Sequence, residues 1–280
     1  MRRIAHVSDM HFGKFDPAVS RGLFNTLIEL NPHFVIVSGD LTQRARNSEF
    51  EDAKKFFAGL QAAGIAWMAI PGNHDIAPFY TPLSRLFTPF KKYRKYISDR
   101  TQLFYTDEEV AVTSINTVRR LQIENGRVTR AQIEEVRMWF SALPKHVVRL
   151  VVTHHPLYRH PTKRLRTPAW RIGKSMSKLR ETGVDVYISG HLHRTSFRRS
   201  DALVVQAGTV SERLRGEMPS FNLLTIDSPH FKVETYRWEP ESGVFKPGRP
   251  SVLLIKNKPP VKPILASTPH TKKLVGSRRS

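Results

Sequence analysis

Residues 187–194, YISGHLHR, run from strand-forming side chains into a glycine and two histidines. Apolar and aromatic residues followed at once by a polar turn are typical of a buried strand that ends at the edge of a sheet. Side chains on extended backbone repeat every two residues, so His191 and His193 point the same way and can reach into one site. Asp9 and His11 have the same spacing after a strand-like segment near the N-terminus.

Seven segments of this kind are predicted as buried strands followed by polar residues. They are RRIAHVSDMH (2–11), HFVIVSGD (33–40), IAWMAIPGNHD (65–75), EEVAVTSINT (108–117), VVRLVVTHHP (147–156), VDVYISGHLH (184–193) and ALVVQAGT (202–209). Helical patterns lie between several of them, at SRGLFNTLIELN (20–31), NSEFEDAKKFFAGLQAAG (47–64), TRAQIEEVRMWFSALP (129–144) and KSMSKLRETG (174–183). This alternation favours an α/β protein with parallel strand pairs.

The ends of the predicted helices and a late hairpin complete the expected fold. Ser48 and Thr129 are predicted helix N-caps, and Gly64 is a predicted helix stop. Residues 220–227 (SFNLLTID) and 231–240 (FKVETYRWEP) predict an antiparallel hairpin with no helix between its strands. We therefore expect sheets of mixed strand direction.

Side chains that bind metals follow five of the predicted strands: Asp9, His11, Asp40, Asn73, His154, His191 and His193. The carboxyl ends of strands in open α/β sheets are where ligands bind. The chain has no cysteine, so thiolate ligands are excluded, and oxygen and nitrogen donors suit Mn, Fe, Zn or Co. Seven donors are too many for one ion, but a shared carboxylate divides them into two sets of four. Two ions about 3.5–4 Å apart with a shared carboxylate and hydroxide can drive in-line attack on phosphorus.

The blocks D-x-H, G-D, G-N-H-D, H-H-P and G-H-x-H occur in this order across residues 9–193. Together they resemble the signature of the calcineurin-like metallophosphoesterase superfamily. The resemblance implies a four-layer αββα sandwich with two mixed β-sheets, and a metal-dependent phosphoric ester hydrolase. It also implies two metal sites that share Asp40, with these ligands: Asp9, His11, Asp40 and His193 for the first metal, and Asp40, Asn73, His154 and His191 for the second.

Other polar residues near these blocks are given separate roles. His74 resembles the family's non-ligand histidine, which contacts the phosphate and protonates or stabilises the leaving oxygen. His155 is predicted to lie behind the ligands or to face the substrate. Asp75 either orients His74 or caps a helix, and we interpret His6 and Asp16 as structural.

The particular forms of the blocks indicate a substrate class. SDMHFG, GNHD, HHP and GHLHR look most like those of the bacterial class III cyclic-nucleotide phosphodiesterases, so a 3′,5′-cyclic nucleotide of the cAMP type is the first expectation. One alternative is a lipid-linked pyrophosphate, as in the related UDP-diacylglucosamine pyrophosphatases, and another is a nuclease. A non-catalytic scaffold is disfavoured because the chain retains every predicted ligand and His74.

The net charge of +21 is unevenly distributed. Residues 246–280 hold nine lysines and arginines, many prolines and no acid, which predicts a domain at 1–245 followed by a flexible basic tail. Residues 158–180 add eight basic residues and no acid. Besides a small phosphodiester substrate, we expect this loop and the tail to attract an anionic membrane surface or nucleic acid.

Residues 87–97, FTPFKKYRKYI, are a candidate membrane contact, and the competing interpretation is a solvated helix with one buried aromatic face. No apolar run approaches the roughly 18 residues of a membrane span. The N-terminus is too polar for a signal peptide. The expected location is the cytoplasm, with peripheral membrane attachment as the alternative.

Overall fold

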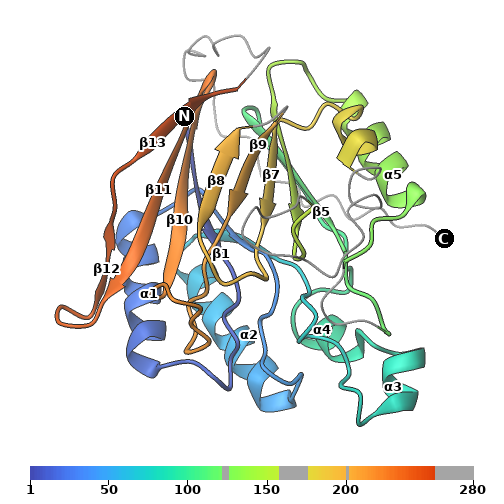
Figure 1. Cartoon of the computed structure of the whole chain (residues 1–280), viewed down its shortest axis with the longest axis vertical. Coiled ribbons are helices and arrows are strands. Elements are labelled where there is room, and N and C mark those ends of the chain that lie inside the picture. The colour runs from blue at the N-terminus through green and yellow to red at the C-terminus, as the bar shows by residue number, and fades with distance from the viewer. Residues whose placement is uncertain (122–125, 158–175, 200–201, 256–280) are drawn as a thin grey trace.

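The computed structural model describes residues 1–121, 126–157, 176–199 and 202–255, which form two β-sheets flanked by helices (Figure 1). The first sheet has the strand order β12-β11-β10-β1-β2-β3, with β13 also paired to β11, and the second has the order β4-β5-β6-β7-β9-β8. The strands of the first sheet are β1 (Arg2–Val7), β2 (Phe34–Val37), β3 (Ala66–Ala69), β10 (Ser220–Asp227), β11 (His230–Glu239), β12 (Val244–Pro247) and β13 (Ser251–Leu254). The strands of the second are β4 (Phe104–Thr106), β5 (Val110–Ile115), β6 (Val148–Thr153), β7 (Val186–Ser189), β8 (Ser196–Arg199) and β9 (Leu203–Gln206).

Both sheets are mixed, as the sequence predicts. In the first sheet β1, β2 and β3 are parallel, whereas β10 pairs antiparallel with both β1 and β11. In the second sheet β5, β6, β7 and β9 are parallel, and β4 and β8 are antiparallel strands at its two ends. All seven predicted strands and the late hairpin are confirmed.

Side chains at several helix ends account for where those helices begin or stop. Their bounds are α1 (Pro17–Leu30), α2 (Asn47–Ala62), α3 (Pro82–Phe87), α4 (Lys91–Tyr96) and α5 (Arg130–Ser141). Asp16 caps α1 by accepting a hydrogen bond from the Ala18 amide, and Thr129 caps α5 by accepting one from the Gln132 amide. Gly64 follows α2 with a φ of +75°, which confirms it as a helix stop.

Alternating side chains of the strands divide the interior into three apolar cores. In β2, Val35 and Val37 belong to a core that also contains residues of α1 and α2, whereas Phe34 and Ile36 belong to a core shared with the second sheet. Residues of β5, β6 and β7 form a third core with α5. Two helical layers therefore enclose two packed sheets, which confirms the predicted four-layer αββα sandwich.

The predicted tail boundary is wrong for residues 246–255. They complete β12 and contribute β13, and both strands pair antiparallel with β11. Phe245 and Ile255 are buried beside them, so this stretch belongs to the domain despite its basic composition. The remaining tail, 256–280, and residues 158–175 of the basic loop lie outside the described residues, so the predicted contacts of that tail and most of that loop stay predictions.

The prediction that Ser48 caps α2 is also wrong. The helix begins at Asn47, with Arg46 as its N-cap. The carboxylate of Glu49 in the first turn accepts hydrogen bonds from the amides of Arg44 and Arg46, at 2.8 and 3.1 Å. This carboxylate satisfies the amides that precede the helix, and Ser48 lies within the first turn. Across the described ranges, no helix combines the length and apolar character needed to cross a membrane.

Candidate metal centre

The seven predicted donors follow strands of both sheets and meet at one edge of the sandwich. Asp9 and His11 follow β1, Asp40 follows β2 and Asn73 follows β3 in the first sheet. His154 follows β6, and His191 and His193 follow β7 in the second. Six of the seven are buried, and His191 is half-buried. The topology thus joins two sheets at a single cluster of nitrogen and oxygen atoms.

The first donor group contains Asp9, His11, Asp40 and His193, whose candidate ligand atoms all lie within 4.8 Å of one another. His193 Nε2 lies 3.1 Å from Asp9 Oδ1 and 3.3 Å from His11 Nε2. His11 Nε2 lies 3.7 Å from Asp40 Oδ2. These four residues are the set that the resemblance implies for one metal ion.

The second donor group is formed around Asn73 and His154. Asn73 Oδ1 lies 3.0 Å from His154 Nε2 and 3.1 Å from His191 Nδ1, and those two nitrogens are 3.2 Å apart. His154 Nε2 lies 3.4 Å from Asp40 Oδ2, the same oxygen that faces His11. One carboxylate oxygen of Asp40 therefore lies between the two groups.

These separations fit metal coordination. Ligand atoms bound at about 2.1 Å to one ion, at tetrahedral or octahedral angles, lie roughly 3.0–3.4 Å apart. Asp9 Oδ2 accepts hydrogen bonds from Ser8 Oγ (2.6 Å) and the His191 amide (2.8 Å), whereas Asp9 Oδ1 is buried without a hydrogen bond. An orphaned carboxylate oxygen that faces two imidazoles is well placed to bind a cation.

The pKa values describe a site that attracts positive charge. Burial opposes ionisation of Asp9 and Asp40, but nearby histidines outweigh it and hold the pKa of both carboxyls well below the usual range. Burial lowers the pKa of His11 and of His191 to about 3, so both rings are neutral, the form that binds metals. Burial also lowers the pKa of His154, but Asp40 reverses this and raises it to about 9. A positive charge beside Asp40 is thus stabilised.

The backbone at the donors is strained. Asp9, His11, Asp40, His191 and His193 all have positive φ, between +46° and +71°. Residues other than glycine avoid this region, and strain of this kind concentrates at functional sites. Hydrogen bonds between the two loops, from the Asp9 amide to Gly39 O (3.0 Å) and from the His11 amide to Asp40 O (2.9 Å), hold this conformation.

The glycines before the donors serve mainly to leave space. A Cβ on Gly72 would lie 2.2 Å from the Asp40 amide nitrogen, and one on Gly190 would lie 1.8 Å from Ser8 Oγ. Neither glycine has a positive φ, so lack of space and not backbone conformation excludes a side chain at these two positions. Gly39, by contrast, has a φ of +98°, a left-handed conformation that favours glycine.

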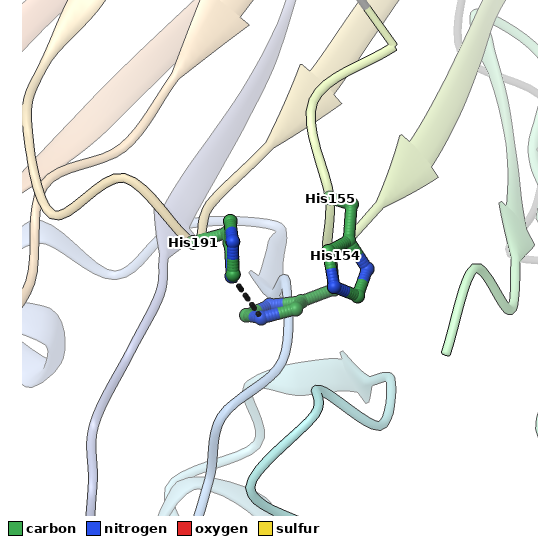
Figure 2. Close-up of side chains that lie close together, drawn as sticks. All are labelled: His154, His155 and His191. Carbon is green, nitrogen blue, oxygen red and sulfur yellow. Dashed lines mark hydrogen bonds between the residues drawn. The ribbon is translucent and has the colours of Figure 1, made fainter. Parts of the chain in front are cut away.

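His155 lies beside the second donor group, as Figure 2 shows. With His154 and His191 it forms a group whose candidate ligand atoms are within 4.8 Å of one another. Its ring centroid is 4.5 Å from that of His191, and its Nδ1 is 2.9 Å from Thr117 Oγ1. The contact with Thr117 holds the His155 ring against His191.

Asp75 connects the loops that carry Asp40 and Asn73. Its carboxylate accepts hydrogen bonds from the amides of Leu41, Thr42 and Gly72, at 2.8–3.0 Å, and from the Thr42 hydroxyl. Burial raises its pKa to about 7, with the Asp40 charge adding to the effect. It neither contacts the His74 ring nor caps a helix among the described elements. His6 and Asp16 are structural as expected, since His6 bonds Ser38 Oγ and Asp16 caps α1.

His74 faces the donors without joining them, and it is held by a residue that the sequence did not reveal. A carbonyl oxygen only accepts, so His74 Nδ1 donates to Gln43 O (2.7 Å), and Nε2 is left to accept from Arg213 Nη1 (2.8 Å). Arg213 Nη1 is also 3.4 Å from His11 Nε2, and the Arg213 carbonyl accepts from His193 Nδ1 at 2.6 Å. Arg213 lies seven residues beyond the end of β9, so it carries no strand-edge signal of the kind that marks the other site residues.

A four-layer sandwich that gathers two overlapping sets of metal donors at one edge has the architecture of a dinuclear metallohydrolase. Residues 2–195 match the calcineurin-like phosphoesterase family, and the chain belongs to that family. It is therefore a metal-dependent phosphoric ester hydrolase, and the family implies a dinuclear metal centre for the donors described above.

Solved structures share the fold at low sequence identity. A dimetal phosphatase from Danio rerio is 13% identical with a TM-score of 0.62, over 91% of this chain and 99% of that one. The purple acid phosphatase PPD1 from yellow lupin (Lupinus luteus) seeds is 13% identical with a TM-score of 0.64, over 95% of this chain and 57% of that one. GAP50, the anchor in the inner membrane complex of Plasmodium, is 15% identical with a TM-score of 0.60, over 92% and 90%. No curated protein matches the sequence.

Proposed function

We propose that this chain hydrolyses a phosphodiester bond in a small substrate, with a 3′,5′-cyclic nucleotide of the cAMP type as the preferred class. The proposal of metal-dependent hydrolysis rests on the position of Asp40 Oδ2, which lies 3.7 Å from His11 Nε2 and 3.4 Å from His154 Nε2. The preference for a diester is supported by the motif forms SDMHFG, GNHD, HHP and GHLHR.

The seven donor residues would hold two ions, and Asp40 would contribute to both sites. Two bound divalent ions would lower the pKa of a water molecule and neutralise charge on the phosphoryl oxygens. Mn, Fe, Zn and Co all suit this set of nitrogen and oxygen donors. The neutral rings of His11 and His191 and the ionised Asp9 and Asp40 are already in the protonation states that such ligands need.

His74 and Arg213, both half-buried beside the donors, would act on the substrate. Nδ1 of His74 is held by Gln43 O, so only Nε2 can exchange a proton with a leaving oxygen. To act as an acid, His74 Nε2 must carry a proton. A guanidinium only donates hydrogen bonds, so the hydrogen bond from Arg213 to Nε2 must break before Nε2 can be protonated. A bound phosphoryl oxygen offers Arg213 another acceptor. Substrate binding would thus free His74 for proton transfer.

Replacement of Arg213 by alanine is expected to raise KM for the diester about ten- to a hundredfold, the effect of losing one charge-assisted hydrogen bond. The metal content should not change, because Arg213 contacts His193 through its backbone carbonyl, which alanine retains. Steady-state kinetics and elemental analysis measure both effects. Arg215→Ala, two residues along the same loop, is the matched control and should resemble the wild type.

A substrate panel with added Mn²⁺ tests the proposed substrate. It contains 3′,5′-cyclic nucleotides, bis-p-nitrophenyl phosphate, a nucleoside-diphosphate lipid and single-stranded DNA. We expect the highest kcat/KM among natural compounds for a cyclic nucleotide. A higher kcat/KM for the nucleoside-diphosphate lipid would contradict this proposal and assign a lipid-linked pyrophosphate as the substrate. The exposed apolar side chains that follow the Asn73–Asp75 turn favour this alternative.

A further inference from the structure

Large apolar side chains gather on the surface directly after the GNHD turn. Five residues between positions 79 and 87 are each 45–73% exposed: Phe79, Tyr80, Leu83, Leu86 and Phe87. We call this cluster the 79–87 surface. Single exposed apolar residues are ordinary, but a contiguous group marks an interaction site. Figure 1 shows that α3, which carries three of them, lies at an outer corner of the molecule beyond α4.

The exposure of the 79–87 surface is built into the local structure. The Arg85 side chain is buried beneath it and donates to the carbonyls of Ala77 (2.6 Å) and Arg120 (2.5 Å). Its guanidinium carbon lies 3.7 Å from the centre of the Phe79 ring. Arg120 in turn donates to Leu86 O at 2.6 Å. These contacts fix the backbone from within while the apolar side chains face outward.

Positive charge follows the 79–87 surface directly in the chain. Residues 76–98 contain five lysines and arginines and no acid. Four of these basic residues lie on α4, and all four are exposed: Lys91, Lys92, Arg94 and Lys95. Tyr93 of α4 is buried and donates to Ala69 O at 2.6 Å, so the helical part of residues 87–97, Lys91–Tyr96, does bury an aromatic side chain, as the competing interpretation predicts. The apolar contact surface is therefore on α3, and α4 supplies the charge beside it.

We propose that the 79–87 surface, with the basic side chains of α4, docks on an anionic lipid bilayer. Aromatic and leucine side chains enter the boundary between headgroups and acyl chains, while lysine and arginine attract anionic headgroups. A second copy of the chain is a poorer occupant, because a self-complementary contact would place these basic groups against each other. The inference does not depend on which phosphodiester is the substrate.

Vesicle flotation tests the docking with phosphatidylcholine vesicles that contain or lack phosphatidylglycerol, at low and moderate salt. We expect the wild type to bind the anionic vesicles and to bind less at moderate salt. Leu83→Ser/Phe87→Ser should lower the partition coefficient at least about tenfold, since each substitution removes a large apolar side chain that the bilayer would otherwise bury. Met138→Ser/Val252→Ser, at two exposed positions on α5 and β13, is the matched control and should bind like the wild type.

Hydrolysis of soluble bis-p-nitrophenyl phosphate shows that each variant is folded, and it separates docking from catalysis. Three results would overturn the proposal: no vesicle binding by the wild type, equal binding to neutral and anionic vesicles, or undiminished binding by Leu83→Ser/Phe87→Ser. Sedimentation velocity tests whether a second copy of the chain, and not a bilayer, binds this surface. Dimerisation that the double substitution abolishes, without vesicle binding, would assign the surface to a second copy.

Discussion

Replacement of Asp40 by asparagine is expected to remove bound metal and to lower kcat at least about 10³-fold, because several kcal/mol of transition-state stabilisation depend on the metal ions. Asp40 is the one residue shared by both donor groups, and its Oδ2 faces His11 on one side and His154 on the other. An amide carries no charge and binds metal weakly. Its carbonyl oxygen can still accept the hydrogen bond that Asp40 Oδ1 accepts from the His74 amide at 2.8 Å, so the local backbone is preserved.

Elemental analysis after dialysis measures the bound metal, and hydrolysis of bis-p-nitrophenyl phosphate measures kcat. Asp16→Asn is the matched control, because Asp16 caps α1 and asparagine is an equally good N-cap. That variant should retain the metal and turnover of the wild type. Asp40→Asn protein with wild-type metal content and turnover would show that the two donor groups do not share this carboxylate.

The fold and the donor cluster were predictable because both depend on short-range patterns. Each buried strand carries apolar side chains up to the point where a polar donor begins, as in VIVSGD before Asp40 and VYISGH before His191. Parallel strands bring such ends to the same edge, so no knowledge of loop structure is needed to place the donors together. The start of α5 was predictable from Thr129, whereas α1 begins three residues before the predicted 20–31, at the point where Asp16 caps it.

Features that depend on distant contacts were not predictable. β13 alternates half-buried and exposed residues and lies between prolines, so its pairing with β11 leaves little trace in the sequence. Arg213 belongs to the site only because its loop returns to His74 and His193, which precede it by 139 and 20 positions. Tyr93 is likewise buried through a distant contact, the hydrogen bond from its hydroxyl to Ala69 O. Its burial is the reason that α3 and not α4 offers the apolar contact surface.

The strained donors explain how the fold serves the chemistry. A left-handed conformation costs roughly 1–3 kcal/mol for each residue other than glycine, and five of the seven donors adopt it. The Thr209 hydroxyl donates to Asp9 O at 2.7 Å, and hydrogen bonds between the Asp9 and Asp40 loops add further restraint. These hydrogen bonds and the surrounding core fix the backbone that carries the donors, which limits the conformational entropy that metal binding must remove.

Replacement of His74 by alanine is expected to leave the metal content unchanged and to lower kcat about 10²–10⁴-fold for an alkoxide leaving group, the usual loss when a general acid is removed. The His74 side chain contacts Gln43 O and Arg213, whereas its link to Asp40 runs through the backbone amide, which alanine retains. A p-nitrophenolate leaving group departs without a proton. The loss should therefore be large for a cyclic nucleotide and small for bis-p-nitrophenyl phosphate.

The ratio of these two losses distinguishes proton transfer from a general disturbance of the site. A structural defect would slow both substrates alike, whereas the absence of a proton donor slows only the substrate with the poor leaving group. His230→Ala, at an exposed position of β11, should leave both rates unchanged. If elemental analysis found that His74→Ala had lost metal, His74 would be a ligand, and the proton would have to come from another group near the leaving oxygen.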